Sequence, residues 1–303
     1  MSSLRLATRG SQLAMAQSDI AADALRAADP ALDVEYVLVH SEGDIDRTSP
    51  LHEIGGRGVF VRAVEQALLD GRADIAMHSL KDVPTAPVEG LTLAAILTRG
   101  DPRDVLVASG GQRLAELPPG ARVGTGSVRR RLLLRALRPD LDVVEIRGNV
   151  DTRVSKVADG EYDAVVIAAA GLDRLGRLGE ATQVFEALEF LPSPGQGAIA
   201  VQCREDDADT VERLLGVDDA GTRAAVEAER GFLAELGAGC TRPVGAYAQI
   251  DGDLVALRAM LGDDAGEHAR FGDAAGPSTD AAELGRGLAR QLLAPPPSGD
   301  GAP

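Results

Sequence analysis

The stretch Met77-His78-Ser79-Leu80-Lys81-Asp82-Val83-Pro84 decides the fold, because it joins a buried strand to a polar turn. Residues 73–77, which lead into this stretch, are mostly apolar and predict a short buried strand. Pro84 ends any regular element and favours an extended conformation in the residue before it, so the polar residues are expected on a turn. Open α/β sheets bind their ligands at the carboxyl ends of strands. The stretch therefore predicts an α/β fold with a ligand site in this turn.

Two residues of the turn, Lys81 and Asp82, place a cation beside a carboxylate, which holds a carboxylate ionised near a ligand. The alternative is a capping turn with a surface ion pair, which contributes little to stability. Lysine occurs only at positions 81 and 156 among 31 basic residues, and the polar stretch is longer than a cap requires. Both observations favour a functional role. His78 has no evident partner, so a catalytic imidazole is not expected there.

The overall composition limits the class of protein. With 303 residues the chain is too long for one ordinary core, and two or three domains are expected. A formal net charge of −16 argues against nucleic acid or an anionic membrane as a partner. Two cysteines are too few for a disulfide framework, and no histidine has metal-ligand spacing, so no metal is expected. No signal-peptide core and no membrane-length apolar run is present, so the protein is expected in the cytoplasm.

The basic residues are mostly arginine and are unevenly distributed. Abundant acid with scarce lysine is typical of proteins from a salt-adapted cytoplasm, although a GC-rich genome would also replace lysine by arginine. Residues 122–153 hold eight arginines against four acidic residues. This basic region inside an acidic protein is expected to bind an anion.

Breaker segments divide the chain into units. Elements of a first unit are predicted at residues 4–8, 12–24, 34–40, 60–69, 73–77 and 91–97. A hinge at 98–102 precedes a similar unit, with elements predicted at residues 122–124, 128–137, 143–146, 150–158 and 164–169. A second breaker at 191–197 leads into a strand at 198–202 that is expected to return to the first unit. Two crossings between two similar α/β units predict a clamshell-like binding protein.

The last part of the chain predicts a smaller unit with helices and a hairpin. Its elements are a helix at 218–236, a glycine-rich loop at 237–243, strands at 244–250 and 254–260, and a helix at 280–293. The Pro/Gly-rich end is expected to be disordered. The predicted domains are residues 1–98 with the returning segment 198–216, residues 102–192, and residues 218–295, followed by a tail at 296–303.

Cys240 is a second candidate for chemistry. Its flanking glycines let a backbone approach a ligand closely, and Arg242 favours the thiolate. The alternative for a free cysteine is a small buried hydrophobe. That alternative fits Cys203, which lies in an apolar strand, better than it fits Cys240.

Arginines at helix starts and strand ends are candidates for anion binding. Arg129, Arg130 and Arg131 begin a predicted helix, and Arg147 follows a predicted strand. Guanidinium groups in such places suit carboxylates or phosphates, and a solvated helix face is the alternative. Consecutive helix positions face different ways, so one or two of the three neighbours are expected to miss the ligand.

Several motifs occur together in an order that one family shares. They are Ala7-Thr8-Arg9-Gly10-Ser11, residues 74–84, residues 147–153, Gly195-Gln196-Gly197-Ala198 and Gly239-Cys240. Over residues 4–293 the chain resembles the porphobilinogen deaminase (hydroxymethylbilane synthase) family. The resemblance implies two periplasmic-binding-protein-like α/β domains that form a hinged cleft. It also implies a smaller C-terminal α+β domain that carries the cofactor cysteine.

The resemblance implies a transferase that joins four porphobilinogen units head to tail, releases ammonia and gives linear hydroxymethylbilane. Asp82 would be the catalytic carboxylate, stabilising positive charge on the reacting pyrroles. Cys240 would carry a dipyrromethane cofactor through a thioether. Residues that would bind the cofactor or substrate are Arg9, Ser11, Gln17, Lys81, Thr125, Ser127, Arg129, Arg130, Arg147, Arg153, Arg174 and Gln196. A monomer is expected.

The chain departs from the family pattern at two positions and leaves two other functions open. Gly126 stands where relatives commonly have a serine, and Arg57 stands for a frequent lysine. A non-catalytic two-lobed anion-binding protein would have a similar fold. A thiol-dependent hydrolase using Cys240 would need a histidine base, which no motif positions.

Overall fold

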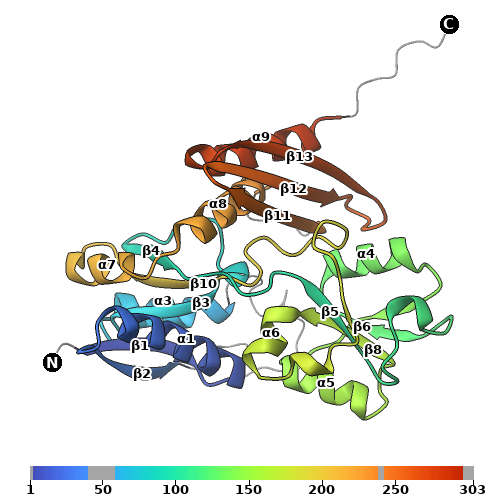
Figure 1. Ribbon diagram of the computed structural model, residues 1–303, viewed down its shortest axis with the longest axis horizontal. Coiled ribbons are helices and arrows are strands. Elements are labelled where there is room, and N and C mark those ends of the chain that lie inside the picture. The colour runs from blue at the N-terminus through green and yellow to red at the C-terminus, as the bar shows by residue number, and fades with distance from the viewer. Residues whose placement is uncertain (1–2, 40–58, 238–241, 296–303) are drawn as a thin grey trace, which may run out of the picture.

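The computed structural model describes residues 3–39, 59–237 and 242–295, and three sheets organise these residues. Figure 1 shows two sheet-based lobes below and a third, smaller unit resting above both of them. The polar loop at 41–58 with Arg57, the central part of the glycine loop with Cys240, and the tail at 296–303 lie outside the described residues. No helix of the described segments is long and apolar enough to cross a membrane.

The first lobe is a five-stranded sheet in the order β2-β1-β3-β10-β4. Its strands are β1 (Ser3–Arg9), β2 (Asp33–Val39), β3 (Ile75–Ser79), β4 (Leu91–Ile96) and β10 (Ile199–Arg204). The strand β1 is parallel to both β2 and β3, whereas β10 runs antiparallel between β3 and β4. The chain therefore comes back to this sheet after it has built the second lobe.

Helices cover both faces of the first sheet because β3 is apolar on both sides. The helices are α1 (Gln12–Ala28), α3 (Val59–Leu69) and α7 (Ala208–Leu215). Ile75 and Met77 pack with residues of α1, and Ala76 between them packs with residues of α3. Successive strand side chains point to opposite faces, which explains this division.

The second lobe repeats the topology, with the order β7-β6-β8-β5-β9. Its elements are β5 (Asp104–Ala108), β6 (Arg122–Gly124), β7 (Asp142–Val144), β8 (Ala164–Ala168), β9 (Gln183–Val184), α4 (Val128–Leu137), α5 (Val150–Ala158) and α6 (Ala169–Arg174). The central strand β6 is parallel to β7 and β8, and β5 is antiparallel to β8. The expected pair of similar α/β units is confirmed.

The third unit is an antiparallel sheet, β11-β12-β13, packed against two helices. Its elements are α8 (Ala220–Glu235), β11 (Val244–Asp251), β12 (Leu254–Gly262), β13 (Ala269–Pro277) and α9 (Ala281–Leu293). The strand β13 was not predicted, because its glycines and terminal proline are poor strand formers. The predicted strand at 143–146 is also displaced, since β7 ends at Val144.

Two neighbouring chain crossings join the lobes. The amide of Gly100 donates to the carbonyl of Gly197, with N and O 3.1 Å apart. Gly197 has a φ of +88°, and a Cβ on it would lie 2.5 Å from the Gly100 carbonyl oxygen. Only glycine fits such a close approach of two backbones at positive φ.

The third unit is tied to both crossings through Glu229 of α8, which has no exposed surface. Its carboxylate accepts from both terminal nitrogens of Arg99 on the first crossing, at 2.7 and 2.9 Å. It also accepts from the amide of Gly195 on the second crossing and from the amide of Ala248 on β11. Four donors offset the cost of burying one carboxylate.

Candidate active site

The turn after β3 has the conformation that the sequence predicted. Leu80–Asp82 form a single 3₁₀ turn, and Val83 is extended, with φ −79° and ψ 122°. The Asp82 side chain is exposed, as a carboxylate that meets a ligand must be. The ends of β1 and β3 meet here because Leu6 pairs with Ile75 in parallel register.

A small pocket of about 40 Å³ opens where these strand ends meet. Arg9, Gln17, Ser79, Asp82 and His78 contribute its polar lining. The amide nitrogen of Gln17 donates to the Ser79 hydroxyl, with a separation of 2.8 Å. The structure thus brings three expected site residues, Arg9, Gln17 and Asp82, into one place.

Ser11 lies just after Arg9 and starts the helix α1. Its hydroxyl accepts from the amide of Ala14, with O and N 3.3 Å apart, as expected of a helix N-cap. This bond holds the first turn of α1 beside the Arg9 end of β1.

Lys81 lies on the same turn but reaches the second crossing. Its ammonium nitrogen is 3.4 Å from the side-chain oxygen of Gln196, which is almost fully buried. Burial lowers the pKa of Lys81 to about 8, against the opposing attraction of Asp82. A cation that is costly to keep charged gains from an added negative ligand.

Arg129 and Arg130 of α4 are buried and share one carboxylate, Asp104 at the start of β5. Arg129 donates to Asp104 at 2.8 Å, and Arg130 donates to it at 2.7 and 3.1 Å. Burial by itself would raise the pKa of Asp104, but the two arginines hold it far below its ordinary value. Gln196 also donates to Asp104, at 2.8 Å, which links the second crossing to this cluster.

Thr125 and Ser127 support the start of α4. The Ser127 hydroxyl accepts from the Arg130 amide at 3.4 Å, and the Thr125 hydroxyl accepts from the Ser127 amide at 3.2 Å. Both hydroxyls therefore already accept a bond that shapes this turn. A Cβ at Gly126 would lie 3.2 Å from the Ile146 carbonyl oxygen, so a serine there would require a small backbone shift.

Arg147 and Arg153 of the second lobe lie close enough to affect one another electrostatically. The Arg153 Nε donates to the Gly148 carbonyl at 2.7 Å. Burial and the positive charges of Arg130 and Arg147 lower the pKa of Arg153 to about 10, and Asp82 opposes this shift. Asp82 of the first lobe is thus close enough to act electrostatically on Arg153 of the second.

Arg174 lies beside the crossings, where it donates to the Gly197 carbonyl at 2.5 Å. Burial lowers the pKa of Arg174 to about 10. Burial therefore disfavours the charged forms of Lys81, Arg153 and Arg174, and nearby carboxylates offset this only in part. A group that carries several carboxylates fits this donor set.

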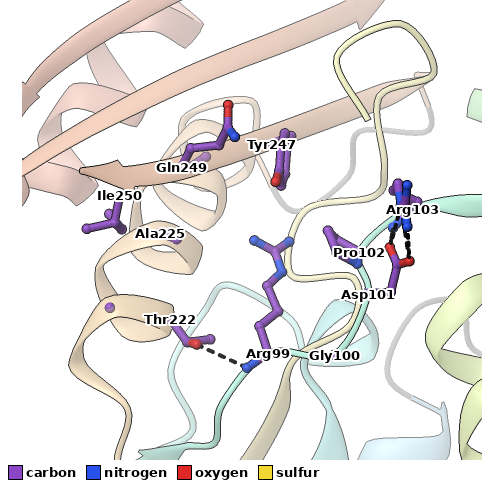
Figure 2. Close-up of a pocket in the computed structure, with 12 residues that line it drawn as sticks. Arg99, Gly100, Asp101, Pro102, Arg103, Thr222, Ala225, Tyr247, Gln249 and Ile250 are labelled. Atoms are coloured by element: carbon purple, nitrogen blue, oxygen red, sulfur yellow. Dashed lines mark hydrogen bonds and ion pairs between the residues drawn. The ribbon is translucent and has the colours of Figure 1, made fainter. Parts of the chain in front are cut away.

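A second, larger hollow of about 520 Å³ lies between the first crossing, α8 and β11. Figure 2 shows Arg99 reaching up toward Tyr247 while its backbone amide bonds Thr222, and Arg103 bonding Asp101. None of the expected site residues lines this hollow. Its two arginines are already paired with carboxylates, so it is not the candidate active site.

Several residues of the site were not identified from the sequence. Asp104 begins an apolar strand, and only its position just after the hinge at 98–102 distinguishes it. Gln202, which bonds His78, lies inside an apolar strand. An isolated polar residue within a buried apolar run is the signal that would have identified both.

The fold and the site define a two-lobed α/β protein in which buried cations of the second lobe lie near the exposed carboxylate of Asp82. Residues 4–212 match the family model described as "Porphobilinogen deaminase, dipyromethane cofactor binding domain". Residues 223–294 match the model described as "Porphobilinogen deaminase, C-terminal domain". The chain belongs to the porphobilinogen deaminase family.

Similar proteins carry the same name. The porphobilinogen deaminase of Acidothermus cellulolyticus is 50% identical over 297 residues, covering 97% of this chain and 89% of the relative. That of Thermobifida fusca is 55% identical over 259 residues, covering 85% and 80%. Among solved structures, the methionine-binding protein MetQ matches 71% of this chain and 89% of its own, with a TM-score of 0.46 at 15% identity.

Proposed function

We propose that this protein is a hydroxymethylbilane synthase. It joins four porphobilinogen units head to tail, releases an ammonia for each, and gives linear hydroxymethylbilane, from which tetrapyrroles are made. The observation that carries this proposal is the placement of Asp82, an exposed carboxylate that lies close to Lys81 and Arg153, two cations whose pKa values burial lowers. Such a site suits a substrate that carries carboxylates and forms a positively charged pyrrole intermediate.

Asp82 would act on the pyrrole nitrogen. Loss of ammonia leaves a cationic, azafulvene-like pyrrole, and a fixed carboxylate beside its N–H stabilises that charge as it develops. The same carboxylate can take up and return a proton during the coupling step. Its exposed position leaves room for a ring beside it.

The cations would bind the acetate and propionate groups of the substrate. Lys81, Arg153 and Arg174 are the first candidates, because burial makes each costly to keep charged without a ligand. Arg9, which lines the pocket of Asp82, and Arg147, which lies near Arg153, are further candidates. Direct contacts from the remaining predicted residues stay predictions, and these residues are Ser11, Gln17, Thr125, Ser127, Arg129, Arg130 and Gln196.

A dipyrromethane cofactor, attached to Cys240 by a thioether, would supply the first two pyrrole rings on which a chain can be extended. Its carboxylates suit the donor set of Lys81 and the arginines described above. The chain's own residues would hold these carboxylates, keep the free pyrrole end near Asp82, and exclude water from it.

The test is an intact mass together with an ammonia assay. The wild-type protein should carry a two-pyrrole adduct and release ammonia from porphobilinogen, and Cys240→Ala should lack both properties. Cys203→Ala is the matched control, because burial raises the pKa of Cys203 to about 11 and its thiol should stay unmodified. An active enzyme with an unmodified Cys240 thiol would refute the proposal.

We further propose a monomer in the cytoplasm, tolerance of high salt, and the domain bounds 1–98 with 198–216, 102–192 and 218–295. The non-catalytic anion-binding alternative is not favoured. It requires binding of porphobilinogen without ammonia release, so the same assay distinguishes it.

A further inference from the structure

His78 begins a chain of three buried polar side chains behind the candidate active site. Its Nε2 lies 2.8 Å from the Gln202 side-chain oxygen, and the Gln202 amide nitrogen donates to Glu65 Oε1 at 3.3 Å. The three residues come from β3, β10 and α3, and each is at most 8% exposed. Nothing in the role proposed for Asp82 uses them.

The hydrogen bonds between these three side chains determine which ring nitrogen of His78 carries the proton. The Gln202 amide points its nitrogen at the Glu65 carboxylate, so its oxygen must face His78. That oxygen can only accept, and the imidazole Nε2 must therefore be the donor. The other nitrogen, Nδ1, then has a free lone pair, and it forms no hydrogen bond with the described residues.

His78 also lines the pocket that contains Asp82. A volume of about 40 Å³ holds a group the size of water or ammonia, whereas a cavity that binds a benzene ring measures roughly 150 Å³. The pocket itself is therefore too small for a pyrrole ring, and a ring beside the exposed Asp82 would lie outside it. Of the small groups of porphobilinogen, the nitrogen of its aminomethyl group suits the His78 end of this pocket, because it can donate to the Nδ1 lone pair and a carboxylate cannot.

We propose that His78 Nδ1 accepts a hydrogen bond from the aminomethyl nitrogen of porphobilinogen and orients this nitrogen for departure. The proposal rests on the proposed function and adds a substrate-contacting residue to it. The ring would be a neutral acceptor, with Nε2 held by Gln202, so it orients the nitrogen without taking its proton.

The step balances without any further reactant. The carbon–nitrogen bond of the protonated aminomethyl group breaks, and its electron pair leaves with the nitrogen as ammonia. The positive charge passes to the pyrrole, whose methylene carbon is attacked by the α-carbon of the neighbouring ring. The Asp82 carboxylate takes up the proton lost from that α-carbon and returns it to the released ammonia, so nothing is oxidised or reduced.

The charges around the pocket agree with this role. Arg9 and Asp82 face it with opposite signs, and Arg9 favours departure of a neutral nitrogen over an ammonium ion. Glu65 acts from behind Gln202, with Arg62 beside it. Burial lowers the pKa of His78 to about 4, so the ring is neutral at physiological pH.

The first test reads the tautomer directly. Four histidines make the spectrum of ¹⁵N-histidine-labelled holoenzyme simple to assign with a His78→Leu variant. The expected result is a protonated Nε2 and an unprotonated Nδ1 at pH 7. Glu65→Gln keeps the side chain's size but lets the Gln202 amide reverse, so it should populate the opposite tautomer. A protonated Nδ1 in the wild type would overturn the proposal.

The second test separates the nitrogen contact from a structural effect. His78→Leu and Glu65→Gln should each lower kcat/KM for porphobilinogen, the former about tenfold or more, as loss of a charge-assisted bond does. The inhibition constant of an analogue with methyl in place of aminomethyl should stay within about twofold, since it lacks the nitrogen.

The outcomes are distinct. Equal weakening of substrate and analogue, or unchanged kcat/KM in both variants, would overturn the role of His78. His268→Leu is the matched control, because His268 is exposed on the third unit. A wild-type holoenzyme that releases no ammonia would refute the proposed function instead, and the tautomer would still be measured.

Discussion

Asp104→Asn is the substitution that most directly tests how the buried arginines Arg129 and Arg130 are held in place. The change keeps the size of the side chain but removes the charge that two buried arginines share. Arg129 and Arg130 are 4% and 6% exposed, so water cannot replace the lost carboxylate. The new amide would also point a donor at a guanidinium group or at Gln196.

The expected cost follows from this geometry. Removing one partner of a buried ion pair destabilises a protein by about 3–5 kcal/mol. Since Arg129 and Arg130 hold the pKa of Asp104 low, its contribution is fully present above the unfolded value of about 3.9. It is lost as the pH falls below that value through the folded pKa. The difference in the free energy of unfolding between the wild type and Asp104→Asn should therefore be largest near pH 7 and smaller in acid.

Urea denaturation of the holoenzyme at pH 7 and at pH 3.5 measures both effects. The control is Asp101→Asn, which breaks a partly exposed pair with Arg103 on the first crossing and should cost at most about 1 kcal/mol. Equal losses for the two variants would refute the claim that Asp104 organises the buried arginines. A difference that widens in acid would refute the assigned charge state.

Three further predictions concern ligand binding and chemistry. Asp82→Asn should retain the adduct but slow single-turnover ammonia release by roughly 10²–10⁴, the range of a positioned acid/base group, and a wild-type rate would remove Asp82 from the mechanism. Arg153→Leu should raise KM or stall cofactor assembly at a cost of about 2–4 kcal/mol, and normal turnover would make Arg153 a surface residue. The charge of Lys81 is present below pH about 8 and is lost above it, so kcat/KM should fall as the pH rises through 8. Lys81→Arg should move that fall to higher pH, and an unchanged profile would refute the assignment.

Local pattern determined a large part of this protein. The Pro84 turn, the polar residues before it and the alternation of apolar strands with helices predicted two similar α/β units, and the observed topologies confirm them. Helix α4 and helix α5 have the predicted bounds, and the Ser127 hydroxyl caps the start of α4. Ordered motifs also identified the family, since each motif is a contiguous stretch.

Only the tertiary structure decided which distant side chains meet. Asp104 and Arg130 are separated by 26 positions, and His78 and Gln202 by 124, so no local pattern links them. The strand β13 forms, despite its glycines, because β12 supplies a full antiparallel partner and α9 packs against it. Burial is the common physical reason. A polar group removed from water must find a partner, and the return of β10 between β3 and β4 determines which partner lies within reach.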